Sequence, residues 1–179
     1  MRAPVAPPRA LSQPLRIGML FGFGVVAVLA AMIPLGPGGS LVPPDLLFCL
    51  VVAWTLRSPD TVPVWALVVL GLFGDLMLSR PVGLGALGLL LAAEIIRGGA
   101  NRIRGLPFPA EWLAASVLFA VVLAFMHLAL RLVFAEGPPP VDLLRHLVAT
   151  ALAYPVVALA VAVGLRPGAR AARRLEGFA

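Results

Sequence analysis

Few side chains in this sequence have types and spacings that could do chemistry. Asp75 is the strongest candidate, because it lies inside an apolar stretch where an ionised carboxylate is costly without a partner. His127 and Arg131 are four residues apart in a second apolar stretch, so they would share one face of a helix. Arg145 lies at the start of a third. These four residues predict a polar cluster within the membrane.

Two roles are open for this cluster. Asp75 could form an ion pair with Arg131, Arg80 or Arg145 near one face of the membrane, and such a group is a candidate for binding a partner or ligand. Alternatively, the charges only fasten helices together or are solvated at the interface, because buried pairs often serve structure alone.

The other patterns give no catalytic or metal-binding apparatus. Residues 83–88 spell the glycine pattern of a dinucleotide-binding loop, but no strand precedes them and they are apolar, so close helix packing explains them better. The two histidines, His127 and His146, lie in different apolar stretches with no cysteine partner, which is poor spacing for a metal. No serine lies in a nucleophile elbow. We therefore expect no catalytic residue, metal or cofactor.

The composition predicts a membrane protein. Of 179 residues, 61% are hydrophobic and 12% charged, and the mean hydropathy is +1.02. Soluble domains contain about half apolar and about a quarter charged residues, and so short a chain cannot hide the excess in one aqueous core. Because one crossing takes about 20 apolar residues, we expect an all-α bundle of about six transmembrane helices.

Apolar runs divide the chain into six expected spans with short connections. The spans cover residues 15–35, 43–56, 62–78, 82–96, 112–134 and 143–165. The second span is short for a full crossing, and Asp45 is expected to cap its start. Residues 97–109 are predicted to be a polar connection. We expect a disordered tail over residues 1–14, one membrane domain over residues 15–165 and a basic tail over residues 166–179.

The positions of the arginines predict the orientation. All 14 basic residues are arginine, and with the N-terminus in the cytoplasm all of them except Arg80, Arg131 and Arg145 fall on inner segments. Both termini are therefore predicted to be cytoplasmic. No aromatic residues are interleaved with these arginines, so we expect contact with anionic lipid and not with nucleic acid.

Two stretches of the sequence resemble the MreD family of bacterial rod-shape-determining membrane proteins. One is residues 71–87, where a Gly-x-x-x-Asp pattern ending at Asp75 precedes a short turn and a Pro-x-Gly helix start. The other is Pro44-Asp45-Leu46-Leu47. The resemblance implies interaction or architecture residues without a catalytic role. They are Pro44, Asp45, Gly74, Asp75, Pro81 and Gly83, and we add Arg80 from the turn.

The resemblance also implies a fold and a function. The fold would be similar to that of the membrane S subunits of energy-coupling-factor transporters. The function would be that of a non-enzymatic adaptor in the cell-elongation complex, which makes peptidoglycan at the bacterial inner membrane. The expected partners are MreC, RodA with its cognate transpeptidase, MreB and membrane lipids.

Two alternatives stay open. The chain could be the substrate-binding membrane subunit of an energy-coupling-factor vitamin transporter, which would need a polar pocket inside the bundle. It could also be a small channel or proton-coupled transporter, which would need more intramembrane polar groups than the sequence offers. Similarity of fold cannot choose among these functions.

Overall fold

The computed structural model describes residues 13–34, 42–103, 107–134 and 139–165. These residues form six α-helices and one short 3-10 helix, with no strand among them, which confirms the predicted all-α bundle. The elements are α1 (Gln13–Ala31), α2 (Leu46–Arg57), η2 (Pro59–Thr61), α3 (Val64–Met77), α4 (Leu84–Ile103), α5 (Phe108–Phe134) and α6 (Pro140–Gly164). Gln13 and Pro14, predicted as tail, begin α1. The rest of the two predicted tails lies outside the described residues.

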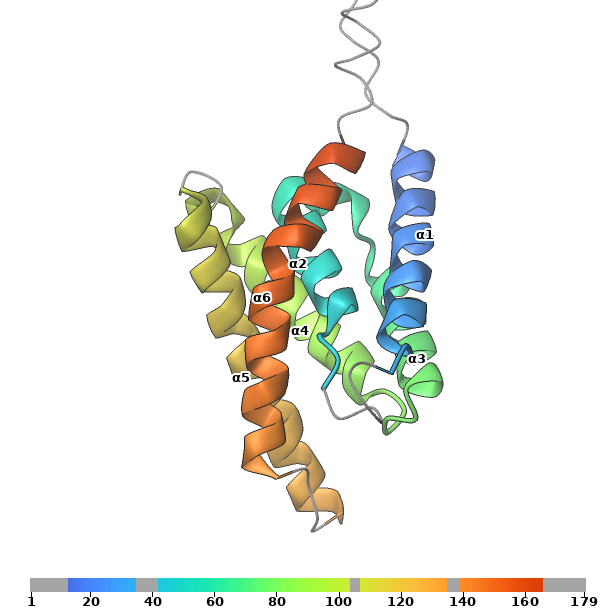
Figure 1. The fold of residues 1–179 in the computed structure, drawn as a ribbon. Coiled ribbons are helices and arrows are strands. Elements are labelled where there is room, and N and C mark those ends of the chain that lie inside the picture. The colour runs from blue at the N-terminus through green and yellow to red at the C-terminus, as the bar shows by residue number, and fades with distance from the viewer. Residues whose placement is uncertain (1–12, 35–41, 104–106, 135–138, 166–179) are drawn as a thin grey trace, which may run out of the picture.

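Helix α2 forms the centre of the bundle (Figure 1). It contacts α1, α4, α5 and α6, and every residue from Leu47 to Leu56 is buried. Its 12 residues extend about 18 Å, whereas the hydrocarbon core of a bilayer is about 30 Å thick. Helix α2 is therefore too short to cross a bilayer by itself, and it fills the interior of the bundle.

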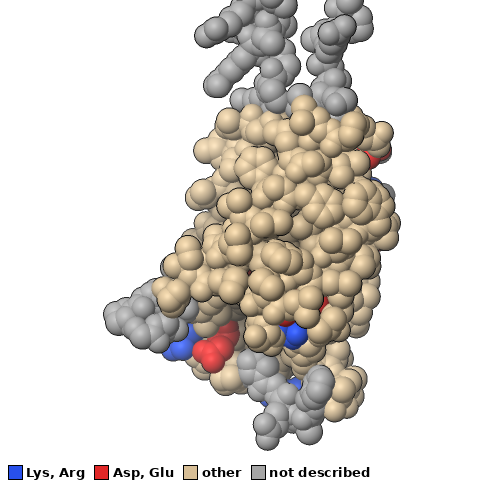
Figure 2. All heavy atoms as spheres, turned by 90° about the vertical axis from the view of Figure 1, so that its right-hand side faces the viewer, with Lys and Arg blue, Asp and Glu red and all other residues tan. Residues whose placement is uncertain are grey.

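Three of the described helices, α1, α5 and α6, are long and apolar enough to cross a membrane. The start of α1 and the end of α6 lie at the same end of the bundle (Figure 1). The side formed by α1 and α3 is a broad surface with few charged side chains (Figure 2). Large apolar side chains such as Val26, Trp65 and Leu76 are more than half exposed there. Such a surface suits contact with lipid.

Helix α4 is longer than predicted. It continues to Ile103, so residues 97–103 are helical and do not belong to the polar connection. Arg97 lies on this helix, and its guanidinium binds the carboxylate of Glu94 and the backbone carbonyl of Val62. Residues 104–106 of the predicted connection lie outside the described residues.

Helices α5 and α6 begin earlier than predicted, at Phe108 and Pro140. Pro109 and Pro140 lie in their first turns, where the missing N–H of proline removes no helical hydrogen bond. Trp112, the predicted start of the fifth span, donates from Nε1 to the carbonyl oxygen of Ala151 at 2.7 Å and so joins α5 to α6.

Glycines allow α3 to pack closely against its neighbours. A Cβ atom at Gly71 would overlap the Cα of Ala86 on α4. A Cβ at Gly74 would lie 3.4 Å from a methyl carbon of Leu47 on α2. Side chains larger than hydrogen at Gly71 would therefore push α3 away from α4.

We predict that Gly71→Ala lowers the free energy of unfolding by about 1–3 kcal/mol, the usual cost of overpacking a core. Gly22→Ala is the matched control, because a Cβ there would meet no atom within 4 Å, and we expect it to change stability by less than about 0.5 kcal/mol. Titration of the purified protein in mixed micelles with a denaturing detergent measures both. Equal stability of the two variants would contradict the close contact of α3 with α4.

Candidate functional site

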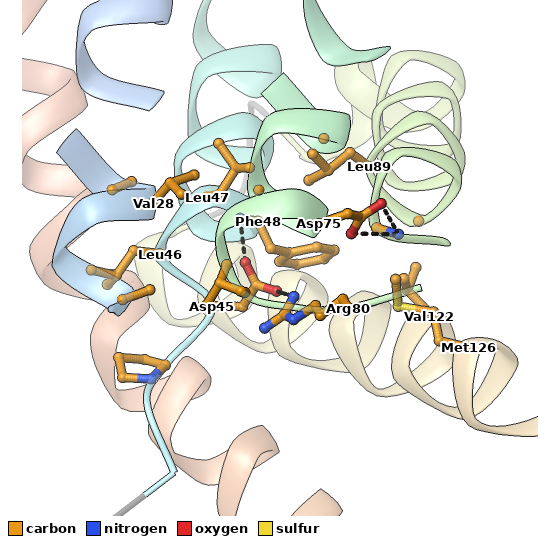
Figure 3. Close-up of a pocket in the computed structure, with 18 of the residues that line it drawn as sticks. Val28, Asp45, Leu46, Leu47, Phe48, Asp75, Arg80, Leu89, Val122 and Met126 are labelled. Atoms are coloured by element: carbon orange, nitrogen blue, oxygen red, sulfur yellow. Dashed lines mark hydrogen bonds and ion pairs between the residues drawn. The ribbon is translucent and has the colours of Figure 1, made fainter. Parts of the chain in front are cut away.

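Asp75 caps helix α4 from the preceding helix. It lies near the end of α3 and is only 1% exposed. Its Oδ2 accepts a hydrogen bond from the backbone N–H of Gly83 at 2.9 Å, and both carboxylate oxygens lie 3.1 Å from the backbone nitrogen of Gly85. The first N–H groups of a helix have no partner within that helix. The carboxylate of Asp75 supplies one for α4 (Figure 3).

The negative charge of Asp75 is balanced by the backbone. Charge-assisted N–H bonds and the partial positive charge at a helix N-terminus both stabilise a carboxylate. Among the described residues no arginine forms an ion pair with Asp75, so the predicted pair with Arg131, Arg80 or Arg145 is wrong. The prediction considered charged side chains and overlooked the free N–H groups at the start of α4.

The turn between α3 and α4 depends on glycine at two positions. Gly83 has a φ of +94°, which residues with a side chain rarely adopt. A Cβ at Gly85 would overlap the carboxylate of Asp75, and one at Gly88 would lie 2.9 Å from the terminal methyl of Met126 on α5. The predicted role in helix packing is confirmed at Gly88, whereas Gly83 and Gly85 serve the turn, and their N–H groups bind the carboxylate of Asp75.

Asp45 joins three elements at the same end of the bundle, which we call the Asp75 end. Its Oδ1 accepts from the backbone N–H of Phe48 at 3.0 Å, which confirms the predicted cap of α2. Its Oδ2 lies 3.2 Å from Nη1 of Arg80 in the turn. Its own N–H donates to the hydroxyl of Thr150 on α6 at 3.0 Å. Figure 3 shows Asp45 and Arg80 facing each other, and the carboxylate of Asp75 on α3 directed at the start of α4.

The other members of the predicted polar cluster do not join Asp75. Arg145 pairs with Asp142 on its own helix at 3.1 Å, a largely exposed contact of small energetic value. Arg131 is exposed and forms no ion pair with a described residue. His127 lines a cavity whose lining does not include Asp75. A shared helical face, as predicted for His127 and Arg131, therefore did not place the two side chains in one site.

A cavity of about 400 Å³ lies beside the Asp45–Arg80 pair, between the start of α2, the α3–α4 turn, α5 and α6. Apolar side chains such as Leu123 and Met126 form much of its wall, and the histidines His127 and His146 also line it. Nδ1 of His146 lies 2.9 Å from the carbonyl oxygen of Pro43. Nδ1 of His127 is buried and has no hydrogen-bond partner among the described residues. The cavity is large enough for a small molecule.

The six residues that the family resemblance singled out, together with Arg80, lie at the Asp75 end. Pro44 is half-buried, and Pro81 is exposed at the rim of the cavity. Gly74 is buried between α1 and α2, near Val28 and Leu47. The remaining four are Asp45, Asp75, Arg80 and Gly83, whose contacts form the α2 cap and the turn.

A polar cluster that was not predicted lies at the opposite end of the bundle, which we call the Arg57 end. Oε1 of Glu111 on α5 lies 3.2 Å from Nη1 of Arg57 on α2 and accepts from the hydroxyl of Tyr154 on α6 at 2.9 Å. The sequence held a signal for this contact, because Arg57 follows one predicted span and Glu111 precedes another on the same side of the membrane. Opposite charges at such positions often pair.

Comparison with known families identifies the chain. A family model described as rod shape-determining protein MreD matches residues 11–163. The chain belongs to the MreD family. No curated protein and no solved structure matches it. MreD membership gives this chain a role in rod-shape determination, and its long apolar helices are those of a membrane protein. The predicted likeness to transporter S subunits stays a prediction.

We predict that Asp75→Asn lowers the free energy of unfolding by about 1–3 kcal/mol, because the amide group leaves one buried N–H donor of α4 facing another donor. Asp142→Asn is the matched control, since its carboxylate forms only the exposed pair with Arg145, and we expect a change below about 0.5 kcal/mol. Detergent-induced unfolding measures both variants. A neutral effect of Asp75→Asn would show that the carboxylate does not hold the turn.

Proposed function

We propose that this MreD-family chain is a non-enzymatic adaptor of the bacterial cell-elongation complex, which builds peptidoglycan at the inner membrane. The strongest support comes from the groups that the carboxylates of Asp75 and Asp45 bind. Asp75 and Asp45 bind backbone N–H groups and Arg80 of the chain itself. A general acid or base must instead reach the group whose proton it transfers. These carboxylates suit a role in holding a surface in a fixed shape.

We propose further that the Asp75 end faces the periplasm and the Arg57 end the cytoplasm. The excess of arginine on the segments assigned to the cytoplasm supports this orientation. The start of α1 and the end of α6 lie at the same end, so both termini would share one side of the membrane (Figure 1).

Cysteine labelling tests the orientation. In a Cys49→Ala background, which removes the single native cysteine, we expect Val82→Cys in the α3–α4 turn to react with a membrane-impermeant maleimide on spheroplasts. Asp60→Cys in η2, at the opposite end, should react only after the membrane is opened. Both native side chains are exposed. The reverse pattern would contradict the proposed orientation.

The proposed partners are MreC, RodA with its transpeptidase, and MreB. At the Asp75 end, Leu76 and Val82 expose 61% and 67% of their surface, beside or within the α3–α4 turn. We propose that this apolar rim binds MreC, whose exposed part lies in the periplasm. MreB is a filament protein of the cytoplasm and would meet the Arg57 end, directly or through another subunit.

Affinity purification from mildly solubilised bacterial membranes tests the adaptor role. We expect the wild-type chain to recover MreC, RodA or the transpeptidase, and Val82→Asp to recover about tenfold less MreC, a loss of about 1.4 kcal/mol of binding. Val141→Asp, a change at a valine of similar exposure (57%) near the start of α6, should recover as much as wild type. Absence of all three partners from the wild-type sample would contradict the proposal.

The second candidate is a vitamin-carrier subunit of the energy-coupling type. The cavity of about 400 Å³ favours it, because the Nδ1 of His127 that lines it has no hydrogen-bond partner in the part of the chain that the structure describes. The same purification separates the two functions, since a carrier would recover paired cytoplasmic ATPases with their membrane coupling subunit. We favour the adaptor because the chain belongs to a family of shape-determining proteins.

A further inference from the structure

A second cavity, of about 380 Å³, lies at the Arg57 end of the bundle. Arg16 reaches it from the start of α1, and Arg57 and Ser58 from the end of α2. Ala162 and Leu165, at the end of α6, complete its lining. This cavity is far more polar in character than the one beside His127, and the proposed adaptor role does not use it.

Only one of the two arginines of this cavity has a carboxylate partner among the described residues. Oε1 of Glu111 lies 3.2 Å from Nη1 of Arg57, and this oxygen also accepts a hydrogen bond from the hydroxyl of Tyr154. Arg16 forms no ion pair with a described residue. Asp60, in the neighbouring η2, is exposed, and its carboxylate likewise forms no ion pair with a described residue. The cavity therefore carries an excess of positive charge.

Arg16 also keeps an unused donor. Its Nη1 donates to Oγ of Ser58 at 3.2 Å, but its Nε is buried and has no hydrogen-bond partner among the described residues. A buried donor on a charged group is costly when it lacks an acceptor. The ends of α2 and α6 add partial negative charge nearby, but this does not replace an acceptor for Nε. An anion that accepts from the guanidinium would.

We propose that this cavity binds the phosphate group of an anionic phospholipid. A guanidinium presents parallel N–H donors that match the oxygens of a phosphate, and the hydroxyl of Ser58 can add another donor. The cavity lies at the ends of helices whose neighbouring residues Leu15 and Val163 are about half exposed and apolar. A lipid would place its headgroup in the cavity and its acyl chains along these faces. Basic pockets between helices suit acidic headgroups.

Lipid retention in nanodiscs tests this site on the full chain. The protein is inserted into discs of mixed phosphatidylcholine and phosphatidylglycerol, released from them, and its bound lipids are measured by native mass spectrometry. We expect wild type to retain phosphatidylglycerol selectively, and Arg16→Gln to lower this retention about tenfold. Arg145→Gln, at the opposite end and paired with Asp142, should behave as wild type. Equal retention by Arg16→Gln and wild type would overturn the proposal.

A second variant and a competition experiment complete the test. If Arg16→Gln does not fold, Ala162→Leu fills the cavity without removing a charge and should lower retention as well, whereas unchanged retention would overturn the site. Inorganic phosphate added to the nanodiscs distinguishes the source of the anion. Displacement of phosphatidylglycerol by phosphate supports a shared phosphate site. Phosphate binding without selective retention of phosphatidylglycerol would overturn the lipid assignment. No partner protein is needed, so this proposal can fail independently of the adaptor role.

Discussion

A buried carboxylate at the start of a helix determines the shape of one end of this protein. Asp75 is nearly inaccessible, and its oxygens bind the backbone N–H groups of Gly83 and Gly85. Removing that charge from water is costly, so the turn between α3 and α4 must keep those donors in place. This turn also places Arg80 beside Asp45. Asp45 caps α2 and contacts Thr150 on α6. The positions of α2, α3, α4 and α6 therefore depend on the turn formed by residues 78–83.

Unequal helix lengths give the bundle unequal sides. Helix α3 has 14 residues and α5 has 27, which correspond to about 21 Å and about 40 Å along the helix axis. A bilayer meets such a difference by local thinning, by helix tilt, or by contact with another membrane protein. The side formed by α1 and α3 is apolar (Figure 2). The short α3 on this side is therefore a place where the surrounding lipid must thin, the bundle must tilt, or a neighbouring protein helix can pack.

Much of the fold follows from the sequence, because long apolar runs leave few other arrangements in a membrane. The cap at Asp45 could be predicted from local chemistry, and it is confirmed. Helix ends were predicted less well, since a proline such as Pro140 can begin a helix as easily as end one. The groups that bind Asp75 could not be predicted, because they are backbone N–H groups, which nearly every residue has. The contact of Arg57 with Glu111 and Tyr154 depends on how three helices pack together.

Amide hydrogen exchange of the α3–α4 turn, measured by mass spectrometry on the protein in nanodiscs, tests whether the carboxylate of Asp75 holds this turn in place. We expect slow exchange at Gly85 in wild type, because its N–H is bound by Asp75, and much faster exchange in Asp75→Asn, with the amides in the middle of α2 unchanged. Fast exchange at Gly85 in wild type, or no difference between wild type and the variant, would contradict this role of the carboxylate.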